Sequence, residues 1–203
     1  MKTRSKILAT VLATALLVTG TVFGTMAYLT DKDTVTNTMT VGDIDISLDE
    51  AKTDTDGKPV TPASRVNANT YKLIPGHSYT KDPTVQIKEG SEDSYIFITV
   101  DNGIADIEST ETGYTNIATQ ITNAGWLVLD ATVYPGVYYR TYVTTDTDAG
   151  YVVFKNFKIS GTVDNETLAS YKNETIVVNA YAVQQDGFAS AKDAWSATFG
   201  KTN

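Results

Sequence analysis

The residues that could carry acid–base or metal chemistry are few. The chain of 203 residues has one histidine, His77, and no cysteine. Its sequence contains neither an HExxH pattern nor a second imidazole for a zinc site, and it lacks the GxSxG motif that presents a nucleophilic serine. His77 follows Pro75 and Gly76, so we expect an exposed loop residue without a catalytic partner. The sequence therefore predicts a protein that is not an enzyme, with no catalytic residue, metal site or cofactor.

Carboxylates in two polar segments are the remaining candidates for cation binding. Asp54 and Asp56 precede Gly57, and Asp146 and Asp148 lie in a second polar segment. When Gly57 is aligned with the invariant glycine of an EF-hand loop, a lysine falls at the first ligand position, so the EF-hand interpretation fails. Weak binding of calcium at an acidic surface stays open as an alternative, but solvated loops are favoured.

A group of tyrosines could form a binding face. Tyr138, Tyr139 and Tyr142 lie in one predicted strand, where Tyr138 and Tyr142 share a face and Tyr139 takes the other. One of the two groups should then be exposed, and an exposed face of Tyr138 and Tyr142 would suit stacking on sugars. Packing in the core and across strands explains the same tyrosines and is favoured.

The N-terminus has the pattern of an export signal. Three basic residues in the first six are followed by residues 7–26, which carry no charge. That stretch is also long enough to span a bilayer, so a retained anchor is the alternative. The small residues ending at Ala27 favour cleavage between Ala27 and Tyr28, which makes residues 1–27 a signal peptide helix. Contact with the membrane is expected only through the uncleaved signal segment.

The mature chain is acidic. Removal of residues 1–27 changes the formal charge from -8 to -11, because 13 basic residues then stand against 24 acidic ones. Such a charge keeps a secreted protein soluble and repels nucleic acid, so we expect no nucleic-acid partner. Without cysteine, stability outside the cell must come from sheet hydrogen bonds and apolar burial.

Alternation along the early mature chain predicts a strand with an interruption. Residues 44–48 alternate between apolar and polar side chains, as in a half-buried strand. Upstream, Val35, Met39 and Val41 follow the opposite phase. Gly42 lies where the phase shifts, and we expect a bulge or bend there. Residues 49–69 are polar and rich in turn formers, which predicts a long surface loop that adds little to the core.

The rest of the chain is rich in threonine and tyrosine, which favour strands. The apolar run at 95–100 should be a central strand, and Pro135-Gly136 should be the turn between two neighbouring strands. We predict strands at 84–87, 95–100, 126–134, 137–143, 151–159 and 175–183. Helical spacing predicts short helices at 115–124, 164–171 and 190–199, the last with Ser190 as its N-cap.

This pattern predicts an all-β fold. Eight or nine strands with two or three short helical insertions fit a jelly-roll-like β-sandwich, with a looser barrel as the alternative. The expected organisation is a signal peptide at 1–27, an N-terminal extension or donor strand at 28–42, and a single β-sandwich domain at 43–203.

Four segments resemble the TasA/camelysin family of exported bacterial proteins. GTMAYLTD at 24–31 and NTMTVGDIDI at 37–46 are similar to the N-terminal region of that family. LIPGHSYTKD at 73–82 resembles its Pro-Gly segment before a core strand, and AYAVQQDGF at 180–188 resembles the ending of one subgroup. The resemblance covers about half of the chain.

The resemblance implies a jelly-roll domain, secreted by a Gram-positive bacterium through a SipW-type signal peptidase, at the cell surface or in the biofilm matrix. Family members form fibres with themselves or with paralogous subunits, and the segment freed by cleavage becomes a donor strand in the neighbour. Here that strand would contain Val35, Met39 and Val41. A monomeric surface adhesin or carbohydrate-binding module is the alternative. A camelysin-like secreted metalloprotease comes third, because no metal-binding motif accompanies the resemblance.

Overall fold

The computed structural model of the chain describes residues 43–146 and 150–200. The chain divides into two units, Met1–Val41 and Gly42–Asn203, and all described residues belong to the second. Its strands are β1 (Ile46–Ala51), β2 (Arg65–Val66), β3 (Ser78–Thr80), β4 (Thr84–Ile87), β5 (Ser94–Asn102), β6 (Leu127–Asp130), β7 (Tyr134–Tyr142), β8 (Gly150–Val152), β9 (Asn156–Lys158) and β10 (Ile176–Gln184). The helices are the 3-10 turn η1 (Ala105–Ile107), α2 (Ile117–Asn123), α3 (Asn165–Ser170) and α4 (Ala191–Thr198).

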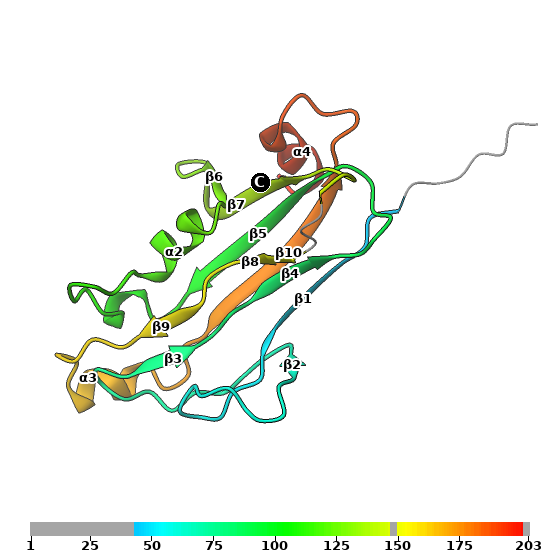
Figure 1. The fold of residues 1–203 in the computed structure, drawn as a ribbon. Coiled ribbons are helices and arrows are strands. Elements are labelled where there is room, and N and C mark those ends of the chain that lie inside the picture. Colours follow the sequence, from blue (N-terminus) through cyan, green and yellow to red (C-terminus); the bar gives the residue numbers. More distant parts are fainter. Residues whose placement is uncertain (1–42, 147–149, 201–203) are drawn as a thin grey trace, which may run out of the picture. The chain divides into compact units, whose positions relative to one another are not determined.

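Two four-stranded antiparallel sheets form a sandwich (Figure 1). One has the order β2-β1-β4-β8 and the other β10-β5-β7-β6, while β3 and β9 form a separate pair. The main core lies between the two sheets, and residues from both contribute fully buried side chains. Examples are Val85 of β4 and Ile96 and Ile98 of β5. The described part of the chain is therefore all-β and sandwich-like, as the sequence predicts.

Helix α2 covers one of the two lateral openings of this sandwich. Ile117 and Ile121 on its inner face are buried in the main core. Gln120 ties the helix to the β8–β9 connection, because its amide donates to the Asn156 carbonyl and accepts from the Lys155 N–H. The buried Trp126 follows the helix and donates from Nε1 to the Val152 carbonyl of β8 (3.0 Å). Side chains and a helix thus close the side on which β7 and β8 lie.

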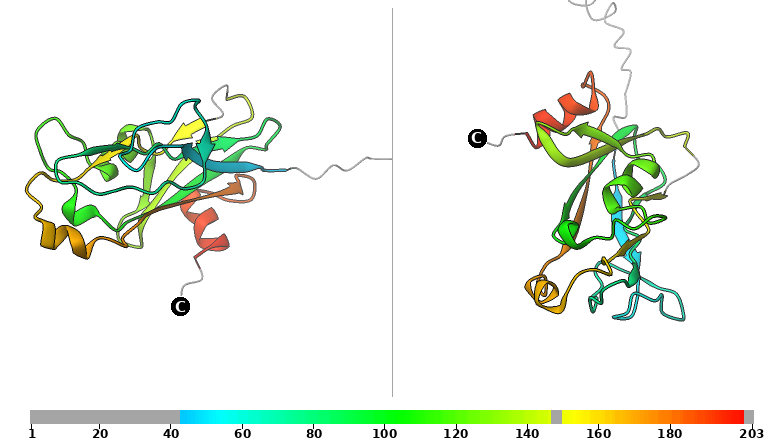
Figure 2. Two further views of the ribbon diagram at one scale, coloured as in Figure 1. Left: turned by 90° about the horizontal axis from the view of Figure 1, so that it is seen from below. Right: turned by 90° about the vertical axis from the view of Figure 1, so that its left-hand side faces the viewer.

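Helix α4 packs on the outer face of the β10-β5-β7-β6 sheet (Figure 2) and has the Ser190 N-cap that the sequence predicts. The Ser190 hydroxyl accepts from the Asp193 N–H and donates to the Asp193 carboxylate. Lys192 bonds Asp130 at the end of β6 (2.6 Å), and this hydrogen bond lowers the pKa of Asp130 to about 2. Trp195 faces the sheet and is 7% exposed. The β10-β5-β7-β6 sheet is therefore covered on both faces, by the main core on the inner face and by α4 on the outer face.

Several predicted strands and all three predicted helices are confirmed. β4 has the predicted bounds, and the run at 95–100 lies within β5, which is central between β10 and β7. Residues 43–48 alternate between exposed and half-buried side chains as expected. The three predicted helices are present as α2, α3 and α4, each one or two residues shorter at its ends.

The predicted turn at Pro135-Gly136 is wrong, because both residues lie inside β7. The chain reverses at residues 131–133 instead, where the Asp130 carboxylate accepts from the N–H groups of Thr132 and Val133. Pairing of β7 with β5 begins only at Val137, so the missing N–H of proline removes no hydrogen bond from that ladder. The predicted strand 126–134 is correspondingly reduced to β6.

Two other boundaries differ from the prediction. The expected strand 151–159 is split into β8 and β9, which belong to different sheets. Residues 153–155 between them lie outside any strand, and Val153 and Phe154 are both buried in the main core where the chain passes from one sheet to the other. The first residues of the expected loop at 49–69 instead continue β1, and Glu50 is buried there.

Candidate functional site

The lateral side of the sandwich where β1 and β10 lie close together, called the opening below, is the candidate site, because both strands are sheet edges there. Among residues 43–146 and 150–200, β10 pairs only with β5, and β1 pairs with β4 on one side and with the two-residue β2 on the other. The β1–β2 pairing involves only Glu50 and Ala51 of β1. Within this part of the chain, the first four residues of β1 and the whole of β10 thus present backbone without a strand partner on this side.

The register of β10 shows which of its residues point to the free edge. The Thr175 carbonyl accepts from Gly103 N–H just before the strand, and Gln185 N–H donates to the Asp93 carbonyl just after it. In an antiparallel ladder the residues that bond the partner alternate with those that do not. The odd-numbered residues of β10 therefore bond β5. The even-numbered residues, from Ile176 to Gln184, direct their N–H and C=O groups outward.

The even-numbered residues of β10 also have apolar side chains that face the core. Ile176, Val178, Ala180 and Ala182 are half-buried and pack against the main cluster. The edge therefore combines free backbone groups with an apolar inner face that is not fully covered. An added strand would satisfy both, because it can bond the edge while its own apolar side chains cover the opening.

The same alternation applies to β1 across the opening. Lys88 N–H donates to the Asp45 carbonyl, so odd-numbered residues of β1 face β4. Ile46 and Leu48 then direct their backbone groups to the free side, and their side chains are half-buried against the core. The opening is thus bordered by one free edge from each sheet.

A groove of about 540 Å³ lies at one end of this opening. Its walls come from β1, from the segment 67–73, and from the segment 171–178 that leads into β10. Leu48, Leu73, Ile176 and Val178 line it with apolar side chains. It runs directly into the edge of β10, since Ile176, Val177 and Val178 line it.

The floor of the groove is polar. Glu50 and Lys81 form an ion pair with 2.5 Å between carboxylate and ammonium, and both residues are buried. The Asn69 amide group donates to the second oxygen of Glu50 (2.9 Å) and to the Ala51 carbonyl (2.8 Å). Because a buried charge is costly without partners, this network explains how two ionised groups are held under the loop.

Tyr71 lies beside the network of Glu50, Lys81 and Asn69, and burial and the Glu50 charge both act on its phenol. Its hydroxyl donates to the Thr80 carbonyl (3.0 Å), and its ring packs edge-on against Tyr79 and Phe157. Burial raises the pKa of Tyr71 to about 12, and the negative charge of Glu50 adds to the shift. The phenol therefore stays neutral in the groove wall across the whole physiological range.

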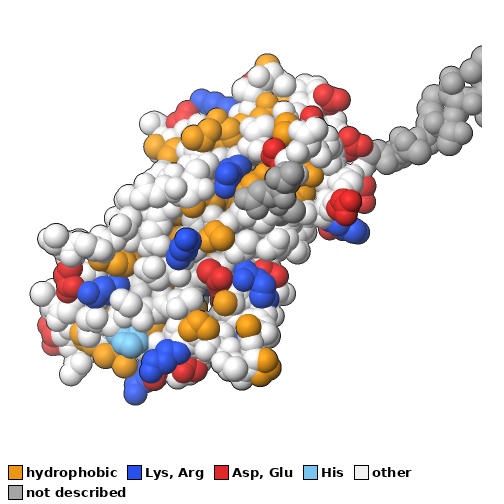
Figure 3. All heavy atoms as spheres, in the orientation of Figure 1, with side chains coloured by type: hydrophobic (Ala, Val, Ile, Leu, Met, Phe, Trp, Pro, Cys, Tyr) orange, Lys and Arg blue, Asp and Glu red, His pale blue; other side chains and the backbone are white. Residues whose placement is uncertain are grey.

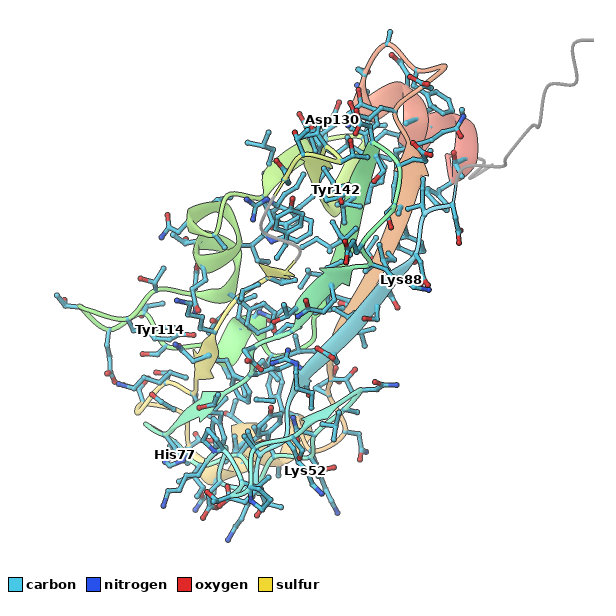
Figure 4. The ribbon with its side chains drawn as sticks, turned by 45° about the vertical axis from the view of Figure 1, so that its right-hand side comes forward. Lys52, His77, Lys88, Tyr114, Asp130 and Tyr142 are labelled. Atoms are coloured by element: carbon cyan, nitrogen blue, oxygen red, sulfur yellow. The ribbon has the colours of Figure 1, made fainter. Side chains whose placement is uncertain are left out.

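The alternative of an exposed aromatic face at Tyr138 and Tyr142 is contradicted, and their positions fit the favoured interpretation of core and cross-strand packing. Tyr142 is 5% exposed and belongs to the main core (Figure 4). Tyr138 is half-buried against the same core. Tyr139 packs against the cluster under α4 on the opposite face. The prediction of an exposed face made of Tyr138 and Tyr142 is therefore wrong, because both faces of β7 are covered. The exposed apolar side chains of this sheet include Leu127 and Val177 instead.

His77 is half-buried rather than the exposed loop residue that the sequence predicts (Figure 4). Its Nε2 lies 2.9 Å from the Asp56 carbonyl, and its ring packs edge-on against Tyr79. Gly57 explains this contact, since its φ is +76° and an added Cβ would lie 2.7 Å from the Tyr79 Cα. Only glycine lets this loop lie so closely on Tyr79. His77 thus holds the 54–57 turn in place.

Local hydrogen bonds occupy the carboxylates of Asp54 and Asp146, which lie in the two polar segments considered for cation binding. The Asp54 carboxylate accepts from the N–H groups of Asp56 and Lys58, which is a turn stabilised by its own side chain. The Asp146 carboxylate accepts from Val143 N–H and from the Tyr151 hydroxyl. Asp148 lies outside the described residues, as do Ala27, Tyr28, Val35, Met39, Val41 and the bend expected at Gly42.

The surface shows how charge is distributed around these features. On the face drawn in Figure 3, acidic and basic side chains are interspersed with small groups of hydrophobic ones. Three of the ion pairs in the described residues join β1 or the β3–β4 connection to a neighbouring segment, for example Arg65 with Asp49. A fourth joins Lys88, just after β4, to Asp45, just before β1. Ion pairs thus link β1 and its neighbouring segments in addition to the core.

The interactions of the groove floor could not be found in the sequence. Glu50 and Asn69 lie in a segment whose polar composition predicts a solvated loop, and Lys81 follows a strand of only three residues. The single signal is the phase of residues 44–48, which places position 50 on the inner face if the strand continues. A charged residue at an inner position needs a partner, but the sequence does not identify it.

The described residues form neither a metal cluster nor a membrane-spanning helix. Within residues 43–146 and 150–200, no group of three or more histidine and carboxylate side chains is placed to hold a metal ion. No helix in that part of the chain is long and apolar enough to cross a membrane. Comparisons of the chain with models of protein families, with curated proteins and with solved structures found no match.

Proposed function

We propose that this protein is an exported structural subunit of a cell-surface or extracellular biofilm matrix, which assembles into fibres by donor-strand addition. The donor is the segment 28–42 of a neighbouring copy or paralogue, and the acceptor is the free edge of β10. The protein acts through assembly rather than catalysis. In this proposal the sandwich has the jelly-roll topology, and a SipW-type signal peptidase releases the donor segment by cleavage after Ala27.

The observation that carries the proposal is the unequal closure of the two sides of the sandwich. Helix α2 and Trp126 close one side, whereas the other is bordered by β10 and β1 with outward-facing backbone groups and half-buried apolar side chains. Natural β proteins usually protect such edges, because an open edge pairs with other chains. An edge kept open and apolar supports a role in strand pairing.

The segment 28–42 suits the donor role by its length and pattern. A strand that pairs with all nine residues of β10 needs about nine residues, and the segment supplies more. Its apolar residues Val35, Met39 and Val41 share one phase, so they can enter the opening together. The residues before them are largely polar, which favours a strand completed by a partner chain.

Assembly should depend on the segment 28–42. A chain that begins at Tyr28 should form fibres or short oligomers, whereas a chain that begins at Asp43 should stay folded and monomeric. Light scattering and negative-stain microscopy of both chains provide the measurement. Equal monomers from both chains would instead favour the monomeric surface adhesin, the second candidate. Loss of folding in the shorter chain would mean that the segment completes its own domain.

Export should end in cleavage after Ala27. The secreted protein should begin at Tyr28 and carry no lipid, since the chain has no cysteine to which a lipid could be attached. N-terminal sequencing of protein from the culture medium and from the cell wall is the measurement. Protein retained in the membrane with residues 1–27 intact would contradict this step and leave the anchor as the better explanation.

A further inference from the structure

At the floor of the groove, the carboxylate of Glu50 lies between the amine of Lys81 and the carboxamide of Asn69. The Lys81 ammonium lies 2.5 Å from one oxygen of Glu50, and the Asn69 amide nitrogen lies 2.9 Å from the other. One carboxylate therefore bridges an amine and a carboxamide. Glu50 and Lys81 are only 3% and 9% exposed, so water has little access to the pair.

We propose that Lys81 and Asn69 join in an intramolecular isopeptide bond, with Glu50 as the acid–base group. A proton passes from the Lys81 ammonium to Glu50, and the neutral amine attacks the Asn69 Cγ. The new C–N bond forms as the carbonyl π pair moves to Oδ1. Glu50 then protonates Nδ2, and the Oδ1 pair re-forms the carbonyl as the Cγ–Nδ2 bond breaks and ammonia leaves. The former Lys81 nitrogen passes its extra proton through Glu50 to the ammonia, which departs as ammonium. The net change converts one ammonium and one carboxamide into a secondary amide and an ammonium ion, so no oxidant or cofactor is needed.

The Asn69 carboxamide is oriented for this reaction. Thr53 N–H donates to Asn69 Oδ1 (2.9 Å), where negative charge develops in the tetrahedral intermediate. The Asn69 amide nitrogen also donates to the Ala51 carbonyl, which fixes the plane of the group. The leaving nitrogen thus already contacts the acid, and the oxyanion already has a donor. Holding the groups in this geometry replaces the high concentration that an uncatalysed aminolysis needs.

The bond would change the architecture of the opening. It links the segment before β3 to the residue after β3, and so closes a covalent loop that includes Tyr71 and Tyr79. That loop forms one wall of the groove next to β10. A covalent tie at this point holds Asn69, and with it the end of the polar segment 52–70, to Lys81 beside the buried Glu50 carboxylate. This inference does not depend on the donor-strand proposal, since the bond forms within one subunit.

Mass spectrometry of the purified full chain tests the bond directly. The folded protein should be about 17 Da lighter than its sequence requires, because ammonia is lost. Trypsin should then yield a branched peptide in which Val66–Lys72 is joined to Leu73–Lys88, with cleavage blocked at Lys81. A chain of the encoded mass, with the peptides 66–72 and 73–81 recovered separately from folded protein, would overturn the proposal.

Matched variants separate the chemistry from the fold. Lys81→Arg keeps the ion pair but has no amine, and Asn69→Ala has no carboxamide, so both should have the encoded mass. Glu50→Gln should leave the reactants unjoined, or slow their joining at least tenfold. Asn69→Asp should lose water instead of ammonia and give a product with the same mass as the wild-type product. A mass deficit that persists in Asn69→Ala would refute the assignment of the acceptor residue.

Discussion

Substitution of Ala180 by proline should abolish fibre growth while leaving the sandwich folded. Ala180 is an even-numbered residue of β10, so its N–H points to the free edge and makes no bond to β5. Proline removes that donor and places its ring where an incoming strand must lie. Because the substitution leaves the β10–β5 bonds in place, we expect near-UV circular dichroism to remain that of the native protein. Light scattering should show monomers where the unchanged chain forms fibres.

Ala180→Ser is the matched control, since it changes the same position but keeps the edge N–H. It should assemble like the unchanged chain. A mixing experiment makes the test sharper. The Ala180→Pro chain still has its segment 28–42 and can only donate, whereas a chain beginning at Asp43 can only accept. Mixed together they should form one-to-one complexes and stop, which size-exclusion chromatography with light scattering would detect.

Two results would contradict donor-strand addition at β10. Fibres of normal length from Ala180→Pro would show that β10 is not the acceptor edge, and the free part of β1 would become the candidate. Absence of any complex in the mixture, with both chains folded, would argue against exchange of the segment 28–42. Either result can be obtained without knowledge of an adhesive ligand.

The sequence predicted the fold best where a local signal marks the element. β4, β5, β10 and the Ser190 cap of α4 were located because apolar runs, alternation, helical spacing and capping are local signals. The prediction failed where it had to say which faces of a strand are covered by distant elements. Tyr138, Tyr139 and Tyr142 alternate as expected, but α4 covers the outer side of the sheet and the second sheet covers the inner side. Helix α4 is distant in sequence, so no local pattern could reveal this.

Non-local pairing also explains why the candidate site was only partly predictable. The resemblance and the phase of Val35, Met39 and Val41 indicated a donor, but the acceptor edge depends on which strand ends each sheet. The groove floor depends on contacts between residues about 30 positions apart, such as Glu50 with Lys81. Sequence alone identifies polar residues in this region, and only the packing of β1 against the 67–73 segment shows which of them are buried.

Truncation of Trp195 to alanine should cause a large loss of stability. Its side chain joins α4 to the sheet by packing against Phe97 and Tyr181, with ring centroids 5.1 Å and 5.6 Å apart. It also packs against Phe199 at the end of the helix, at a centroid distance of 4.7 Å. Removal of a buried tryptophan typically costs about 3–5 kcal/mol, through lost apolar burial and the cavity that remains.

That cost is a large fraction of the about 5–15 kcal/mol by which domains of this kind are stable, so part of the Trp195→Ala population should unfold under mild conditions. Urea unfolding of the chain beginning at Asp43 measures the change without interference from assembly. Leu127→Ala is the control on the same sheet, because Leu127 is 55% exposed and its truncation should change the free energy of unfolding by no more than about 0.5 kcal/mol. Equal unfolding midpoints for Trp195→Ala and Leu127→Ala would mean that α4 adds little to the domain. A selective loss in Trp195→Ala would show that the second layer of packing, on the face opposite the main core, is needed to hold the sheet that offers β10 as an open edge.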